Sequence, residues 1–199
     1  VALASDAACE QWHLEISNLR KPVSQLNPEP ERCIAIYSYF PLGYMSWMNQ
    51  SAGYEEQSGS IIATYVTPYQ KVADYALLKE TAQKTFLTSS RAPISWCANQ
   101  SEFEGVLGLH QPAGVLSTNL GNQNAFYELP AAVLQHRVKL AQNASDAISY
   151  LFGACHHNSD IAELKRTYLP HATALQESAP VIPEKCSHLQ ISTMDTSFD

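Results

Sequence analysis

The sequence is poor in positive charge. Lys and Arg number 12 among 199 residues, against 19 Asp and Glu, which gives a formal net charge of −7. No run of basic residues is longer than the pair Arg20-Lys21. Proteins that bind nucleic acid or anionic membrane surfaces usually carry a basic patch that attracts phosphate groups. The composition therefore argues against both of these partner classes.

Long apolar runs and the signature motifs of common enzymes are also missing. No stretch approaches the roughly 18 consecutive apolar residues of a membrane helix, so we predict no membrane span. The chain contains no G-x-S-x-G, H-E-x-x-H, P-loop or G-x-G-x-x-G pattern. Any reaction must therefore be argued from single side chains.

The five cysteines never form a C-x-x-C pair, which excludes a zinc ribbon or a thioredoxin-type site. Dispersed cysteines in a charge-poor chain favour an exported protein with disulfides, in the periplasm or outside the cell. The spacing favours, among several possible pairings, Cys9 with Cys33 and Cys155 with Cys186. Each bond would contribute about 3 kcal/mol by restricting the unfolded chain. Cys97 is then the remaining thiol.

The length favours a single globular domain over residues 1–199. Residues 1–4 resemble the end of a cleaved export signal, and a cloning remnant fits equally well. Residues 187–199 are expected to form a loosely held tail. The sequence leaves the oligomeric state open.

Apolar periodicity predicts an α+β fold, as a helix-rich single domain with a small, mostly antiparallel sheet and disulfide-stapled ends. The predicted strands are 33–40 and 61–67, with shorter ones between 94 and 117. The predicted helices are 5–20, 69–88, 129–153 and 159–169. The segment 129–153 shows the clearest helical pattern, because its apolar residues recur every three or four positions.

An aromatic-rich loop at about 39–54 is the first candidate site. Its proposed ligand-binding residues are Tyr39, Tyr44, Trp47 and Tyr54. Aromatic rings on a loop make good contact surfaces because they bury a large area at a low entropic cost. This pattern favours an exported, non-catalytic binding or interaction protein whose ligand is a protein, a peptide or a glycan. The alternative is that the rings pack in the core.

A thiol-dependent enzyme is the alternative hypothesis. Cys97 would act as the nucleophile of a hydrolase or transferase, with His110 or His136 as its base. His136 lies on the apolar face of the predicted helix, where a buried, hydrogen-bonded histidine is the commoner explanation.

A metal-dependent hydrolase or transferase is the other version of this alternative. His156 and His157, with His171 further along, are residue types that bind zinc or copper. Two histidines in a loop after a helix are more often surface residues. The expectation is therefore that the protein holds no cofactor, and zinc or copper remains the alternative.

Overall fold

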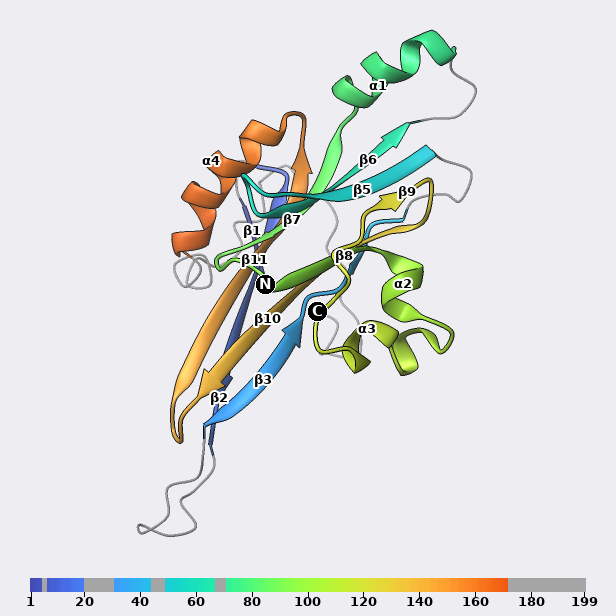
Figure 1. Cartoon of the computed structure of the whole chain (residues 1–199). Coiled ribbons are helices and arrows are strands. Elements are labelled where there is room, and N and C mark those ends of the chain that lie inside the picture. Colours follow the sequence, from blue (N-terminus) through green and yellow to red (C-terminus); the bar gives the residue numbers. More distant parts are fainter. Residues whose placement is uncertain (5–6, 20–30, 44–48, 67–70, 172–199) are drawn as a thin grey trace, which may run out of the picture.

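The computed structural model describes residues 1–4, 7–19, 31–43, 49–66 and 71–171. Within these residues the chain forms a β-sandwich of two antiparallel sheets (Figure 1). A seven-stranded sheet has the order β1-β2-β11-β7-β6-β5-β9. In the smaller, four-stranded sheet, β10 pairs with β3, β4 and β8. The predicted helix-rich fold is therefore wrong.

The elements have the following bounds. The larger sheet contains β1 (Ala2–Leu3), β2 (Cys9–Ser17), β11 (Ser145–Cys155), β7 (Lys84–Ser89), β6 (Ser60–Val66), β5 (Asn49–Glu55) and β9 (Ala125–Phe126). The smaller sheet contains β3 (Arg32–Tyr37), β4 (Phe40–Pro41), β8 (Ser95–Asn99) and β10 (Pro130–Leu140). The helices are α1 (Tyr75–Thr81), α2 (Gln100–Glu104), α3 (Ala113–Leu116) and α4 (Asn158–Tyr168), with 3-10 turns η1 (Val72–Asp74), η2 (Gly108–His110) and η3 (Leu169–His171).

A long hairpin joins the two sheets. Its first strand, β10, lies in the smaller sheet, and its second strand, β11, pairs with β2 and β7 in the larger one. Asn143 adopts a φ of 56° in the turn between them, a left-handed conformation that asparagine tolerates better than most residues. The two strands run alongside each other in Figure 1. The hairpin thus places consecutive strands in opposite layers.

The main core fills the space between the layers. Its side chains come from both sheets, and those of Ile61, Leu87, Leu134 and Ile148 have no exposed area. Burying an aliphatic side chain of this size stabilises the fold by about 1.5–3 kcal/mol. The hydrophobic contact between the sheets is therefore the main source of stability.

A second apolar cluster lies on the outer face of the larger sheet, under α4. Ile161 of α4 is fully buried and belongs to one cluster with Ile62, Phe86 and Leu151. At the start of this helix the Asp160 carboxylate accepts a hydrogen bond of 2.9 Å from the backbone N–H of His157, which satisfies one of the amides that a helix start leaves unpaired. Figure 1 shows α4 beside β11.

The predicted helix 129–153 is wrong, because this segment forms β10 and β11. Residues 130–136 are all buried, and the first five of them form an unbroken apolar run, so this part of β10 lacks the alternation of a half-buried strand. A short apolar run fits the three- and four-residue spacing of a helix as well as it fits a buried strand. The predicted helix 5–20 is also wrong, because Cys9–Ser17 is strand β2.

Other local predictions have mixed outcomes. The predicted strands 33–40 and 61–67 are confirmed by β3 and β6, and the helix 159–169 is confirmed by α4. The predicted helix 69–88 is wrong in its second half, because Lys84–Ser89 forms β7.

The predicted disulfide staples are also wrong. No disulfide occurs among the cysteines that the structure describes, which are Cys9, Cys33, Cys97 and Cys155, while Cys186 lies outside the described residues. Export of the protein remains a prediction, although the disulfides on which it was based are not found among the described cysteines. Residues Ala2–Leu3, which the sequence assigned to a remnant, pair with Gln11 and Glu10 of β2.

A buried histidine links the two sheets. His136 of β10 is 1% exposed, and its Nε2 lies 3.0 Å from the Arg91 carbonyl oxygen. A carbonyl only accepts, so Nε2 carries the proton, and Nδ1 accepts from the Tyr150 hydroxyl at 3.2 Å. Burial lowers the pKa of His136 below its ordinary value of 6.5.

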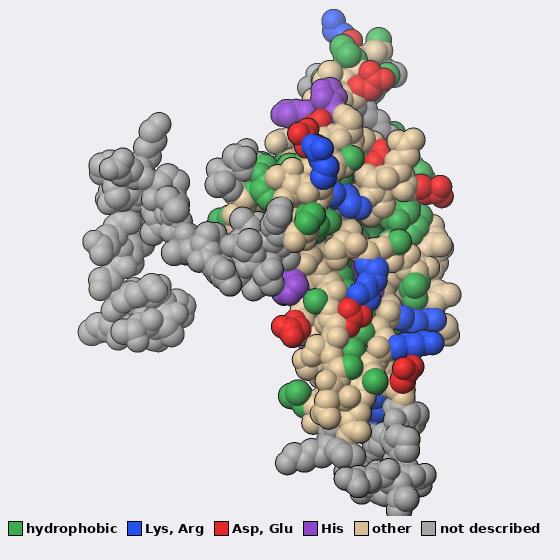
Figure 2. Space-filling view, turned by 90° about the vertical axis from the view of Figure 1, so that its left-hand side faces the viewer, with side chains coloured by type: hydrophobic (Ala, Val, Ile, Leu, Met, Phe, Trp, Pro, Cys, Tyr) green, Lys and Arg blue, Asp and Glu red, His purple; other side chains and the backbone are tan. Residues whose placement is uncertain are grey.

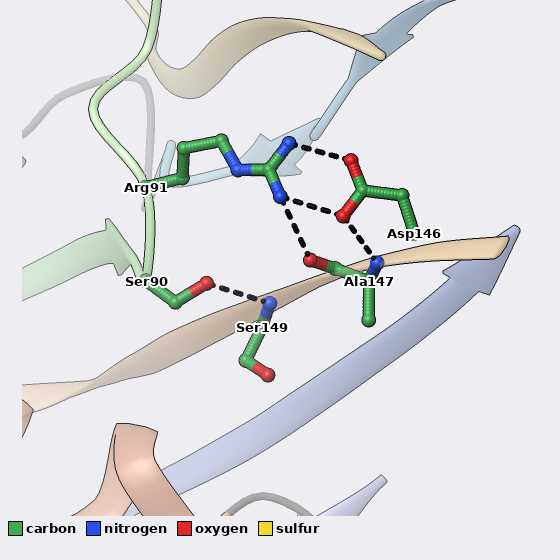
Figure 3. Close-up of polar contacts among 5 residues, drawn as sticks. All are labelled: Ser90, Arg91, Asp146, Ala147 and Ser149. Carbon is green, nitrogen blue, oxygen red and sulfur yellow. Dashed lines mark hydrogen bonds and ion pairs between the residues drawn. The ribbon is translucent and has the colours of Figure 1, made fainter. Parts of the chain in front are cut away.

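An ion pair holds the segment after β7 against β11 (Figure 3). Arg91 donates two hydrogen bonds of 2.8 and 2.7 Å to the two carboxylate oxygens of Asp146. One of these oxygens also accepts from the Ala147 amide, and the Ser90 hydroxyl accepts from the Ser149 amide. Arg91 lowers the pKa of Asp146. Both side chains are partly exposed, so this pair stabilises the fold by about 1 kcal/mol at most.

Replacing Gly153 tests the close contact of β11 with β2. A Cβ at Gly153 would lie 2.5 Å from the Cβ of Cys9 and 2.6 Å from the backbone oxygen of Ala8. We expect Gly153→Ala to lower the free energy of unfolding by about 2 kcal/mol or more, measured by urea denaturation. In the control Gly121→Ala the new Cβ meets only the side chain of Gln123, at 3.3 Å, and the expected loss is below about 1 kcal/mol. Equal losses in the two variants would contradict this packing.

Stability should fall in acid through His136. The pKa of this residue is lowered in the folded state, so below pH 6.5 the unfolded chain binds a proton that the folded one does not. We expect this to cost roughly 1 kcal/mol of unfolding free energy between pH 7 and pH 5.5, measured from urea midpoints. His136→Gln should remove that loss, whereas His110→Gln, at an exposed site, should keep it. The same pH dependence in both variants would refute the assignment.

Candidate functional site

A groove of about 610 Å³ lies on the outer face of the larger sheet. Its floor includes Ile62 and Thr64, which are two residues apart on β6 and therefore share a face. Ile62 also belongs to the cluster under α4, which identifies this face as the outer one. Residues of β5, β7, β9, α1 and the start of α4 complete the lining. The groove therefore draws its residues from distant parts of the chain.

The carboxylate of Glu55 is held in the groove by two hydrogen bonds. Asn158, at the start of α4, donates from its side-chain amide to one oxygen at 2.6 Å. Ser58 donates from its hydroxyl to the other oxygen at 2.5 Å. A carboxylate oxygen has two lone pairs, so each oxygen keeps the capacity to accept another hydrogen bond. Glu55 thus presents acceptors in a fixed orientation.

Asn124 lies in the groove beside a glycine. Its side-chain oxygen accepts a hydrogen bond of 3.3 Å from the backbone N–H of Tyr54. A Cβ at Gly53 would lie 3.0 Å from that same oxygen, which is tighter than almost all such contacts. The absence of a side chain at position 53 therefore allows the amide of Asn124 to approach β5.

An aromatic ring and two opposite charges complete the groove. Phe126 of β9 is 64% exposed, and Glu80 and Lys84 also line the groove. The ring offers an apolar surface, Glu80 offers acceptors and the Lys84 ammonium offers donors. The groove therefore suits a ligand that combines many polar groups with an apolar face.

Two of the four aromatic residues predicted from the sequence, Tyr39 and Tyr54, lie within the described residues. Tyr39 stacks on Phe103 with ring centroids 5.3 Å apart, and its hydroxyl donates to Glu104. Tyr54 lines the groove, and its ring stacks on Trp96 at 5.2 Å. Tyr44 and Trp47 lie outside the described residues. Both described tyrosines thus take part in internal packing.

Cys97 lies in an environment that does not favour a nucleophile. The residue is 3% exposed, its Sγ donates to the Asn99 carbonyl at 3.3 Å, and burial raises the pKa of the thiol. A raised pKa lowers the fraction of thiolate, which is the reactive form. His136 makes the contacts to Arg91 and Tyr150 described above, and His110 is exposed in η2. Within the described residues, no hydrogen bond joins Cys97 to either imidazole.

The candidate metal ligands lie on the surface. His156 and His157 are exposed between β11 and α4, and the side chain of His171 lies outside what the structure describes. The described residues contain no group of three or more His, Cys, Asp and Glu side chains that could hold a metal ion. Metal binding by His156 and His157 stays a prediction.

The distribution of charge on the surface and the lengths of the helices agree with the low charge and the short apolar runs of the sequence. On the face shown in Figure 2, basic and acidic side chains are interspersed, and most of the described surface carries neither. None of the helices in the described ranges has both the length and the apolar character needed to cross a membrane.

Sequence reasoning missed the polar residues of the groove, namely Glu55, Lys84, Asn124 and Asn158. They come from four segments that no short motif connects. The amide-rich run Asn122-Gln123-Asn124 was the only local signal, and amide-rich runs are common in loops.

This chain is similar to proteins described as phosphorylases. A cellobionic acid phosphorylase from Neurospora crassa is 37% identical over 169 residues. That match covers 85% of this chain and 20% of the relative, so the chain spans about a fifth of the relative's length. A solved structure provisionally described as a kojibiose phosphorylase from the human microbiome aligns with a TM-score of 0.40 and 10% identity, over 83% of this chain and 17% of that one.

A family model provides the assignment. Residues 1–170 match the supersandwich domain of glycosyl hydrolase 94. Together with the phosphorylase relative, this match overturns the hypothesis of a non-catalytic binding protein, because the matched family is one of carbohydrate-active enzymes. The observed β-sandwich is consistent with the match. The chain belongs to the glycosyl hydrolase 94 family, through its supersandwich domain.

Proposed function

We propose that this chain is the sandwich domain of an enzyme that cleaves a glycoside with inorganic phosphate. The observation that carries the proposal is the 37% identity to a protein named cellobionic acid phosphorylase, over 85% of this chain. Because the match spans only a fifth of that relative, the reaction is proposed for the whole enzyme.

The proposed reaction balances with two reactants. A phosphate oxygen forms a bond to the anomeric carbon of the glycoside while the bond from that carbon to the glycosidic oxygen breaks. The electron pair of the broken bond stays on the departing sugar oxygen, which takes up the proton that hydrogen phosphate loses when it bonds to the anomeric carbon. The products are a glycosyl phosphate and a free sugar, and no atom is oxidised or reduced. A glycoside and phosphate are therefore sufficient.

The outer-face groove is the part of this domain that we assign to carbohydrate contact. Sugars carry many hydroxyl groups around an apolar face of C–H bonds. Phe126 supplies an exposed ring for the apolar face, and Glu55 and Asn124 supply fixed acceptors and donors for hydroxyl groups. This combination supports a role in holding part of the glycoside.

Phosphate dependence tests the reaction. We expect the natural full-length protein that contains this chain to convert cellobionic acid and inorganic phosphate to a glycosyl phosphate, detected by phosphorus NMR. Without phosphate, conversion should stop because the attacking nucleophile is absent. Release of free sugar at an equal rate without phosphate would mean hydrolysis and would contradict the proposal.

Replacing Phe126 tests the groove. We expect Phe126→Ala to raise the KM for cellobionic acid by roughly 3- to 10-fold, because an aromatic contact contributes about 0.5–1.5 kcal/mol. The ring is 64% exposed, so the melting temperature should change little. Tyr127→Ala is the matched control, because this neighbouring ring is 82% exposed and is not among the groove residues. An unchanged KM in Phe126→Ala would remove the groove from the proposed function.

A further inference from the structure

The chain between β8 and β10 contains a long stretch without charge. Residues 105–127 include no Asp, Glu, Lys or Arg, whereas Glu104 and Glu128 flank the stretch directly. Five large apolar side chains at its start are exposed by 46% to 103%, namely Val106, Leu107, Leu109, Val115 and Leu116. We call these five residues the η2–α3 surface. They belong to the lobe that α2 and α3 form beside β8 in Figure 1. Exposed apolar residues that gather in this way mark interaction surfaces.

Close packing holds this lobe in place. Phe103 and Leu120 anchor it in an apolar cluster together with Val133 of β10. A Cβ at Gly114 would lie 2.4 Å from the Phe103 ring, so α3 approaches α2 as closely as only glycine allows. A surface held in one conformation loses little entropy when it binds, which favours tight association.

Hydrogen bonds to β8 and β10 fix the segment that follows the lobe. The Leu120 amide donates to Ser95 at 2.9 Å, and the Thr118 carbonyl accepts from Gln135 and Arg137 at 3.0 and 2.6 Å. Asn122 exchanges two bonds of 2.9 Å with the backbone of Trp96. The apolar side chains of the lobe therefore stay exposed although the chain that carries them is tied to the sheet.

We propose that the η2–α3 surface docks permanently against another part of the same enzyme. This choice of partner rests on the proposed function. About four fifths of the relative's length lies outside the region that matches this chain, and the partner surface would belong to such a part of the enzyme. Interface cores are depleted of charge and rich in apolar residues, and permanent interfaces are the most apolar. The uncharged stretch fits this description, since none of its 23 residues, from 105 to 127, carries a charge.

The surroundings of the surface favour a different partner over a second copy of this chain. Glu128 directly follows the stretch and Glu102 lies three positions before it, both are exposed, and the whole chain carries a net charge of −7. A symmetric pair would bring the same carboxylates toward each other, which is unfavourable. The complementary surface should therefore be apolar, with Lys or Arg at its rim.

Hydroxyl-radical footprinting tests this docking. Side-chain labelling is compared between the 199-residue chain alone and the natural full-length protein that contains it, without substrate. We expect labelling of Leu109 and Leu116 to fall about tenfold in the full-length protein, because exposures of 59% and 70% would drop to those of an interface core. Leu3 and Leu77, at 75% and 61%, are controls on other elements and should label equally in both. Equal labelling of Leu109 and Leu116 would overturn the proposal.

Two further measurements separate the remaining outcomes. Leu109→Asp should leave the melting temperature of the chain alone unchanged and lower that of the full-length protein, whereas Leu77→Asp should change neither. A dimer of the chain alone in sedimentation that Leu109→Asp dissociates would identify a second copy as the occupant and overturn the proposal. Reduced labelling of Leu109 and Leu116 in a full-length protein without phosphorolysis would support the docking and reject the proposed reaction. Phosphorolysis with unchanged labelling of these residues would support the reaction and reject the docking.

Discussion

The β10–β11 hairpin is the constraint on which the rest of the structure depends. Because one strand lies in each sheet, the position of the hairpin sets the spacing of the sandwich and the register of five neighbouring pairings. His136 on β10 and Tyr150 on β11 meet across that space through a hydrogen bond. Residues 130–136 of β10 are buried on both faces of the strand, and buried and exposed positions alternate only beyond them. This burial hides the first part of the strand from periodicity analysis.

The hairpin also positions the outer-face groove and the η2–α3 surface, for which contacts are proposed above. β11 leads directly into α4, whose first residue, Asn158, orients Glu55 at the groove. β10 follows the uncharged stretch and fixes it through Gln135 and Arg137. The groove and the η2–α3 surface lie on different parts of the sandwich and use no common residue. The proposed ligand contact and the proposed docking therefore do not compete for the same side chains.

Local signals predicted only part of this fold. The strands 33–40 and 61–67 and the helix 159–169 were found because their alternation, β-branched content or capping pattern is contained in a few neighbouring residues. The segment 129–153 failed because burial on both faces removes the alternation that identifies a strand. The groove could not be predicted, since Glu55 and Asn158 are 103 positions apart and meet only through sheet pairing. Tyr54 was predicted to bind a ligand as part of the aromatic loop, and the structure places it in the lining of this groove instead.

The cysteines and the scarcity of charge acquire a different meaning in the sandwich. Cys9 and Cys155 are buried in the cluster under α4, where a thiol packs as a small apolar side chain. A core with this many fully buried aliphatic residues does not need cross-links for stability. Charged residues make up 16% of the chain, compared with about 25% in typical soluble domains. Part of the deficit lies in residues 105–127, where charge would have to be desolvated on docking. The composition that first argued for export is therefore equally consistent with the proposed docking of residues 105–127 against another part of the enzyme.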